Sequence, residues 1–268
     1  MTIFKTPEFY NTRFHYETRH PSGSHHHREM EYITSNTTPP HGIVSLGHTA
    51  LSLLTVSPDS HIFLPLPTPR TIVERLLKFT PNIHILGSSY NECIDLSSTY
   101  MFQHSITNIT PGIIQHYPSN TPIVDEILTH QIPDYIFVPS INLNLASDIC
   151  LQLRNRNHEN IIVIACILPD HFLSPRFNFN YNCIPYYSSI TNDDHRYTRP
   201  SLSTTYKHHT NIIINTVKNP DSCFAQYYPH YPQYDPLNYI TMHISTQYPS
   251  TDHKVVILSG TNLQETTP

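Results

Sequence analysis

Residues 134–169 decide the fold: DYIFVPS (134–140) is followed by NLASDICLQLRNRN (144–157) and then by NIIVIACILP (160–169). The middle segment has apolar residues at the spacing of a helix. The two flanking segments are short apolar runs, and the last is continuous, which is typical of a strand covered on both faces of a parallel sheet. This order of strand, helix and strand predicts two parallel strands joined by a right-handed crossover.

The same alternation extends over most of the chain. Further strands are predicted at 41–47, 61–67, 82–87 and 254–260, and further helices at 69–80, 89–103 and 121–131. Two segments, 170–210 and 226–236, are irregular and predict loops; in the second, closely spaced prolines exclude a continuous helix. The alternation predicts an α/β protein with parallel sheets flanked by helices.

The composition excludes several classes of protein. The chain has 268 residues, enough for one large domain or two small ones. Its formal net charge is −5 and its few basic residues are scattered rather than clustered, so we expect no nucleic-acid partner. Five dispersed cysteines without a CxxC pair argue against a disulfide framework and a cysteine zinc site. No apolar run approaches the ~20 residues that cross a bilayer, and the N-terminus has no apolar signal region. We therefore expect a cytoplasmic protein with no membrane partner.

Four turns at predicted strand ends are candidate ligand sites, because ligands of parallel α/β proteins bind at the carboxyl ends of strands and helix N-termini bind anions. They are Pro21–Arg28, Ser45–Ser52, Ser140–Asn144 and Ser259–Leu263. The first, PSGSHHHR, holds three consecutive histidines. Consecutive residues in regular structure cannot all face one metal ion, so we expect no metal site there.

Read in order, these turns resemble the fold type II pyridoxal-phosphate-dependent enzymes, and most of all threonine synthase. PSGSHHHR is similar to that family's Pro-Thr-Gly-Ser-Phe-Lys-Asp-Arg turn, which carries the Schiff-base lysine, and SLGHTALS (45–52) to its Ser-Thr-Gly-Asn-Thr-Ser-Ala-Ser loop. PDYIFVPSINLNLAS (133–147) resembles the strand and glycine-rich turn that cradle the cofactor phosphate. INTVKNPDS (214–222) and VVILSGTNL (255–263) resemble two C-terminal segments of the family.

The resemblance implies a two-domain fold like that of the tryptophan synthase β subunit. The large domain would comprise residues 1–42 and 132–268, with a small domain inserted at 43–131. The implied reaction converts O-phosphohomoserine to threonine with pyridoxal phosphate, and the implied partner is a small phosphorylated amino acid. The implied cofactor-binding positions are His48, Ser140, Ile141, Asn142, Leu143, Asn144 and Ser259, and the implied substrate-binding positions are Ser45, Leu46 and Thr49.

The departures from the family pattern bear on function. His26 stands at the position of the Schiff-base lysine, and imidazole cannot form a stable Schiff base, although it can transfer protons near neutral pH. His48 replaces an asparagine, and the turn at 140–144 has lost its glycines, so that added side chains crowd a bound phosphate. Residues whose codons lack guanine are abundant, which suggests that guanine depletion of the gene caused some of these changes.

Three functions remain open at this point. The first is a pyridoxal-phosphate enzyme of the threonine synthase type that is catalytically impaired or inactive. The second is a non-enzymatic binding or regulatory homologue, or a decaying remnant, with the same cleft. The third is an unrelated α/β binding protein. The topology separates the last from the others. The resemblance requires that the strand after His41 begin an inserted small domain and that the strand, turn and helix at 134–147 return to the large sheet.

Overall fold

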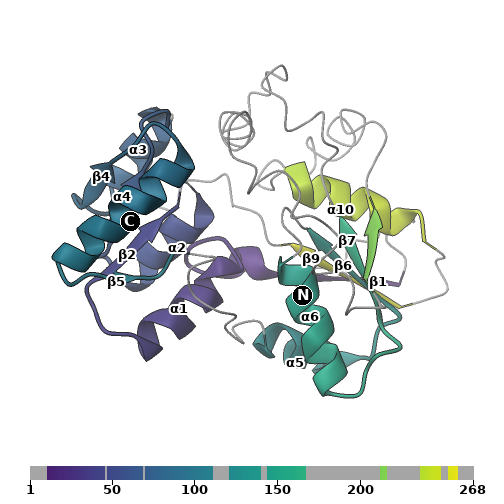
Figure 1. The fold of residues 1–268 in the computed structure, drawn as a ribbon. Coiled ribbons are helices and arrows are strands. Elements are labelled where there is room, and N and C mark those ends of the chain that lie inside the picture. The colour runs from purple at the N-terminus through teal and green to yellow at the C-terminus, as the bar shows by residue number, and fades with distance from the viewer. Residues whose placement is uncertain are drawn as a thin grey trace. The chain divides into compact units, whose positions relative to one another are not determined.

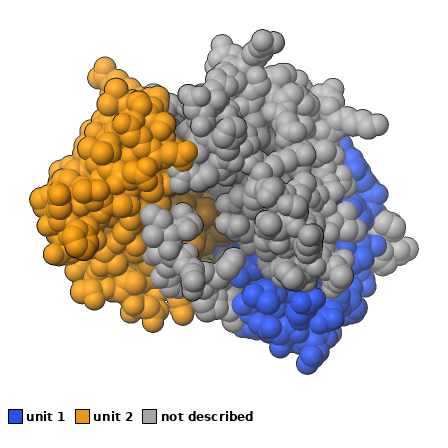
Figure 2. All heavy atoms as spheres, viewed as in Figure 1, with its two compact units in different colours: residues 1–18, 120–172, 199–264 blue, residues 19–119, 173–198, 265–268 orange. Residues whose placement is uncertain are grey.

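The fold was obtained as a computed structural model, which describes residues 11–45, 47–68, 70–110, 121–139, 144–166, 212–215, 236–248 and 253–258. These residues form two compact units (Figures 1 and 2). Unit 1 contains the described residues up to Thr18 and those from 121 onward, and unit 2 contains those from Arg19 to Thr110. The domain bounds expected from the sequence lay at 42/43 and 131/132, whereas the units divide at 18/19 and 119/120.

Unit 1 is built on a five-stranded sheet in which every pairing is parallel. In spatial order its strands are β1 (Thr12–Tyr16), β9 (Lys254–Leu258), β6 (Tyr135–Pro139), β7 (Ile162–Cys166) and β8 (Ile212–Asn215). Helices α5 (Thr121–His130) and α6 (Asn144–Asn155) share one apolar core with this sheet, and α10 (Pro236–Thr246) packs against β6, β9 and β7.

The central strands of unit 1 are covered on both faces, as the apolar runs predict. Ile136 and Val138 of β6 pack with Ile127 of α5 in the core under α5 and α6. Phe137, which lies between them in the strand and is also fully buried, contacts the ring of Tyr248 just after α10. Because successive residues of a strand point to opposite faces, α10 covers the face away from α5 and α6.

Unit 2 is built on a four-stranded parallel sheet. In spatial order its strands are β4 (Ile83–Ile85), β3 (His61–Leu64), β2 (His41–Val44) and β5 (Thr107–Asn108); its helices are α1 (His26–Asn36), α2 (His48–Val56), α3 (Arg70–Leu77) and α4 (Tyr90–Gln103). A short 3₁₀ helix, η2 (Glu17–Arg19), precedes α1. Met30 and Ile33 of α1 are buried in the core of this unit, which explains why α1 belongs to unit 2.

Gly42 lets helix α4 approach the centre of this sheet. A β-carbon at this position would lie 2.5 Å from Met101 Sδ of α4 and 2.8 Å from Ile106 Cγ2, both far inside van der Waals contact. A larger residue at the second position of HGIV would force the side chains of Met101 and Ile106 to move, so glycine favours the close approach of α4 to this fully buried strand.

The topology agrees with the resemblance. Strand β2 after His41 is the first strand of the second sheet, although unit 2 itself already begins at Arg19, and β6 with α6 returns to the first sheet. The predicted strands at 41–47, 61–67, 82–87, 134–140, 160–169 and 254–260 all contain observed strands, and the predicted helices coincide with α3, α4, α5 and α6. The predicted loop at 170–210 lies outside the described residues. No described helix is long and apolar enough to cross a membrane.

Candidate functional site

The turn at Pro21–Arg28 is a tight, well-packed entry to helix α1. The backbone N–H of Gly23 donates to the carbonyl of His20 at 2.7 Å, and Gly23 has a φ of +71°, which glycine adopts without strain. Ser22 and Ser24 are buried on either side of it. The hydroxyl of Ser24 accepts the backbone N–H of His26 at 3.3 Å, where α1 begins. The small residues of the motif thus fix where the helix starts.

His26, at the expected lysine position, is paired within its own helix. Its Nδ1 lies 3.0 Å from a carboxylate oxygen of Glu29, one turn further on, and both side chains are about one-third exposed. His27 is buried instead and contacts Glu31 through Nε2 at 3.3 Å. Burial lowers the pKa of His27, and the attraction of Glu31 opposes that shift only in part. The two histidines therefore have separate carboxylate partners rather than a shared one.

The second motif turn, Ser45–Ser52, links β2 to α2. Ser45 is buried after the end of the strand, Gly47 precedes the helix, and His48 and Thr49 form its first turn. The hydroxyl of Ser52 donates to the hydroxyl of Ser22 at 2.9 Å in the interior, and helices α1 and α2 pack against each other. The structure therefore brings the turns at 21–28 and 45–52 together within unit 2.

His48 is held in its neutral form. Its pKa is lowered to about 3, first because burial disfavours the imidazolium, then because the positive charges of Arg75 and His26 repel a further proton. The residue as a whole keeps intermediate exposure, but its Nδ1 is inaccessible to solvent. Neutral imidazole offers one donor and one acceptor, so His48 can still form hydrogen bonds with a polar ligand.

The remaining predicted site residues are described in part or not at all. Asn144 begins helix α6, directly after the segment that follows β6. Leu46, Ser140, Ile141, Asn142, Leu143 and Ser259 lie outside the described residues. The roles that the resemblance gives these positions stay predictions.

The described lysines do not replace the missing one. The Nζ of Lys254 donates to the backbone carbonyl of Ser245 at 3.0 Å, and Lys254 is buried at the amino end of β9. Ligands of parallel α/β sheets bind at the opposite, carboxyl end of the strands. Lys78 is exposed just beyond the end of α3. The described residues of the motif turns therefore offer no amine, and they do not fit a covalently attached pyridoxal phosphate.

One group of polar residues was missed by sequence reasoning. His15, Glu17 and Glu126 meet in unit 1, although the third lies far from the other two in the sequence. A histidine and a glutamate two residues apart are too common to predict a site, and nothing in the helix segment TPIVDEILTH singles out Glu126.

Comparison with known proteins shows similarity in structure but not in sequence. No protein-family model matches the chain, and no curated protein matches it in sequence. Maize serine racemase superposes with a TM-score of 0.68 at 14% identity, covering 95% of this chain and 84% of the racemase. A pyridoxal 5'-phosphate-dependent aspartate racemase gives 0.66 at 13%, covering 97% and 87%.

A third solved structure, the processed form of threonine deaminase isoform 2 from Solanum lycopersicum, gives a TM-score of 0.70 at 12% identity, covering 96% of this chain and 81% of the deaminase. These neighbours are fold type II pyridoxal-phosphate-dependent enzymes that catalyse different reactions. At such low identity the likeness concerns the fold alone. The chain thus has the α/β fold of the fold type II pyridoxal-phosphate-dependent enzymes.

Proposed function

We propose that this chain is a threonine synthase-like protein that binds a small phosphorylated amino acid but does not catalyse the family reaction. The observation that carries this proposal is the pairing of His26 with Glu29 at the position where the resemblance expects the Schiff-base lysine. The fold and the packing of the two motif turns support a retained scaffold, whereas the side chain at position 26 lacks the primary amine that the chemistry needs.

The chemistry left at position 26 is limited to proton transfer. An imidazole ring can accept or donate a proton at a ring nitrogen, and Glu29 occupies the Nδ1 side of His26. Pyridoxal phosphate supplies the electron sink of the family reaction when it is bound. The turn that would hold the cofactor covalently offers no amine.

We expect wild-type protein mixed with pyridoxal phosphate to gain no borohydride-fixed cofactor above the background from surface lysines. The His26→Lys variant restores an amine in the motif turn and should incorporate cofactor on borohydride treatment. The measurement is the visible spectrum and the cofactor retained per chain after reduction and denaturation. His130→Lys, which adds an exposed lysine at the end of α5, sets the background. Stoichiometric labelling of the wild type, or formation of threonine by it, would refute the proposal.

Ligand binding is expected to depend on the first turn of α2. O-phosphohomoserine should raise the Tm of the wild-type protein, and Thr49→Val should remove most of that rise, because the change deletes a hydroxyl at an implied substrate position. Thr55→Val is the matched control: Thr55 lies in the same helix, and its hydroxyl donates to the carbonyl of Leu51. If O-phosphohomoserine fails to raise the Tm of the wild type, the binding function is excluded and only a remnant remains.

A further inference from the structure

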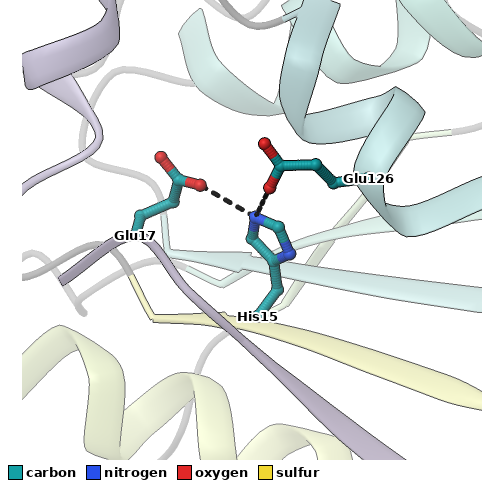
Figure 3. A group of neighbouring side chains, drawn as sticks. All are labelled: His15, Glu17 and Glu126. Atoms are coloured by element: carbon teal, nitrogen blue, oxygen red, sulfur yellow. Dashed lines mark hydrogen bonds and ion pairs between the residues drawn. The ribbon is translucent and has the colours of Figure 1, made fainter. Parts of the chain in front are cut away.

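A histidine and two glutamates converge in unit 1 (Figure 3). His15 comes from strand β1, Glu17 from the 3₁₀ helix that follows it, and Glu126 from helix α5. The Nε2 of His15 lies 2.8 Å from Glu17 Oε1 and 3.5 Å from Glu126 Oε2. Both carboxylates thus approach the same ring nitrogen, from different elements.

The burial of this group is uneven. The side chain of Glu17 is fully buried and that of His15 nearly so, whereas the side chain of Glu126 is 47% exposed. Burying an ionised carboxylate costs free energy unless a positive charge or several hydrogen bonds compensate for it. Glu126 leaves one side of the group open to solvent, which gives an ion a route of entry.

The geometry allows a metal ion as well as a direct ion pair. A ring nitrogen carries at most one hydrogen, so His15 Nε2 can donate well to one carboxylate, which is Glu17 at 2.8 Å. Glu126 at 3.5 Å lies at the limit of a hydrogen bond, yet it points to the same nitrogen. The three ligand atoms lie within 4.8 Å of one another. A zinc ion with bonds of about 2.0–2.2 Å to these atoms would replace the direct contact between His15 and Glu17.

We propose that His15, Glu17 and Glu126 bind a divalent first-row transition metal ion, with Zn²⁺ as the expected occupant. One imidazole and two carboxylates are ligands that Zn²⁺ accepts, and among Mn²⁺, Fe²⁺, Co²⁺ and Zn²⁺ the last generally binds such a site tightly. Three protein ligands leave at least one coordination position for water. This proposal does not rest on the proposed function, which is carried by His26 and the turns at 21–28 and 45–52 of unit 2.

The competing arrangement is a metal-free ion network. Arg13 precedes His15 by two residues on the same strand and is attracted to Glu126. If His15 is protonated, its charge and that of Arg13 balance the two carboxylates without a metal. The two arrangements differ in what the removal of Glu126 does to metal binding, which makes them separable by experiment.

The test uses the full chain, depleted of metal with a chelator and titrated with Co²⁺, whose visible absorption reports its ligands, and then with Zn²⁺ as a competitor. Glu126→Gln, an exposed position, should weaken Zn²⁺ binding by at least about tenfold, since even the loss of partners outside the ligand sphere costs 10–100-fold. The matched control is Glu159→Gln, which removes an exposed glutamate of the same unit that pairs with Arg154. The affinity of Glu159→Gln for Zn²⁺ should equal that of the wild type.

The chain has 20 histidines, so weak binding elsewhere must be separated from this site. A second variant, Glu17→Gln, should also abolish the visible spectrum of tightly bound Co²⁺. Circular dichroism of the metal-free protein establishes whether each variant folds. In the wild type Zn²⁺ should raise the Tm, and in Glu126→Gln it should not. The proposal is overturned if the wild type shows no tight site, or if Glu126→Gln and Glu159→Gln bind Zn²⁺ equally. The ion network would be established instead if Glu126→Gln lowers the Tm of the metal-free protein while Zn²⁺ leaves the Tm of the wild type unchanged.

Discussion

Replacing Phe63 with alanine is expected to lower the free energy of unfolding of unit 2 by about 3–5 kcal/mol. Phe63 lies in β3, between two neighbouring strands, and is fully buried. Its ring stacks on His84 at a centroid distance of 4.7 Å and meets the edge of Tyr100 at 5.6 Å. Alanine would remove the ring and leave a cavity that the sheet cannot close. The measurement is urea unfolding followed by circular dichroism, with the loss read from the transition midpoint.

The chain offers a matched control for this variant. Phe102, in helix α4 of the same unit, is 87% exposed, so Phe102→Ala removes the same atoms without opening a cavity and should change stability by less than about 0.5 kcal/mol. Phe63→Leu keeps much of the volume and should cost clearly less than Phe63→Ala. Equal stability losses for Phe63→Ala and Phe102→Ala would mean that β3 is not buried as described.

Two strands were predicted correctly because their pattern reflects burial on both faces. Strands β6 and β7 come from continuous apolar runs, and all but the first residue of each is buried. Strand β1 was missed because, among the described strands, it lies at the edge of the sheet beside β9 and buries one residue of TRFHY. An edge strand has no reason to carry an apolar run, so its sequence does not differ from that of a loop.

Helix α10 was missed for the opposite reason. Its residues Asn238, Thr241 and Ser245 are fully buried beside Tyr239 and Ile240, so the helix has no polar stripe to reveal its period. Pro236 stands at its first position, where proline is tolerated, but the preceding prolines made the whole stretch resemble a loop. The hydroxyls of Thr241 and Ser245 donate to backbone carbonyls of the same helix, which allows these residues to be buried. The spacing of apolar residues in the sequence does not reveal such burial.

The candidate site was predictable where it depends on local chemistry. The small residues of 21–28 and 45–52 predict turns before helices, and the hydrogen bond between Ser22 and Ser52 joins them. The partner of His26 follows from helical spacing, since Glu29 lies one turn ahead. The group of His15, Glu17 and Glu126 was not predictable, because it depends on how β1 packs beside α5, two elements that are distant in the sequence.

Acidification from pH 6.5 to pH 5 is expected to destabilise unit 2, with about 1–2 kcal/mol contributed by His48 alone. The unfolded chain protonates this residue at its ordinary pKa of 6.5, whereas the folded chain does so only at about 3. Between these values the unfolded state binds more protons, so stability is fully present above pH 6.5 and is lost as the pH falls toward 3. The full slope of about 1.4 kcal/mol per pH unit is an upper bound, because His48 keeps intermediate exposure. Urea unfolding at several pH values measures the slope.

Other histidines of unit 2 act in the same direction, since burial lowers the pKa of His27, His41, His61 and His84. The share of His48 is therefore isolated by His48→Asn, which restores the asparagine of the resembled loop and cannot titrate. This variant should reduce the dependence of stability on pH between 5 and 6.5, while His130→Asn, at an exposed position in unit 1, should leave the slope of unit 2 unchanged. An undiminished slope in His48→Asn would show that this ring takes up its proton in the folded state as readily as in the unfolded one. The Nδ1 of His48 would then be open to water rather than inaccessible to it.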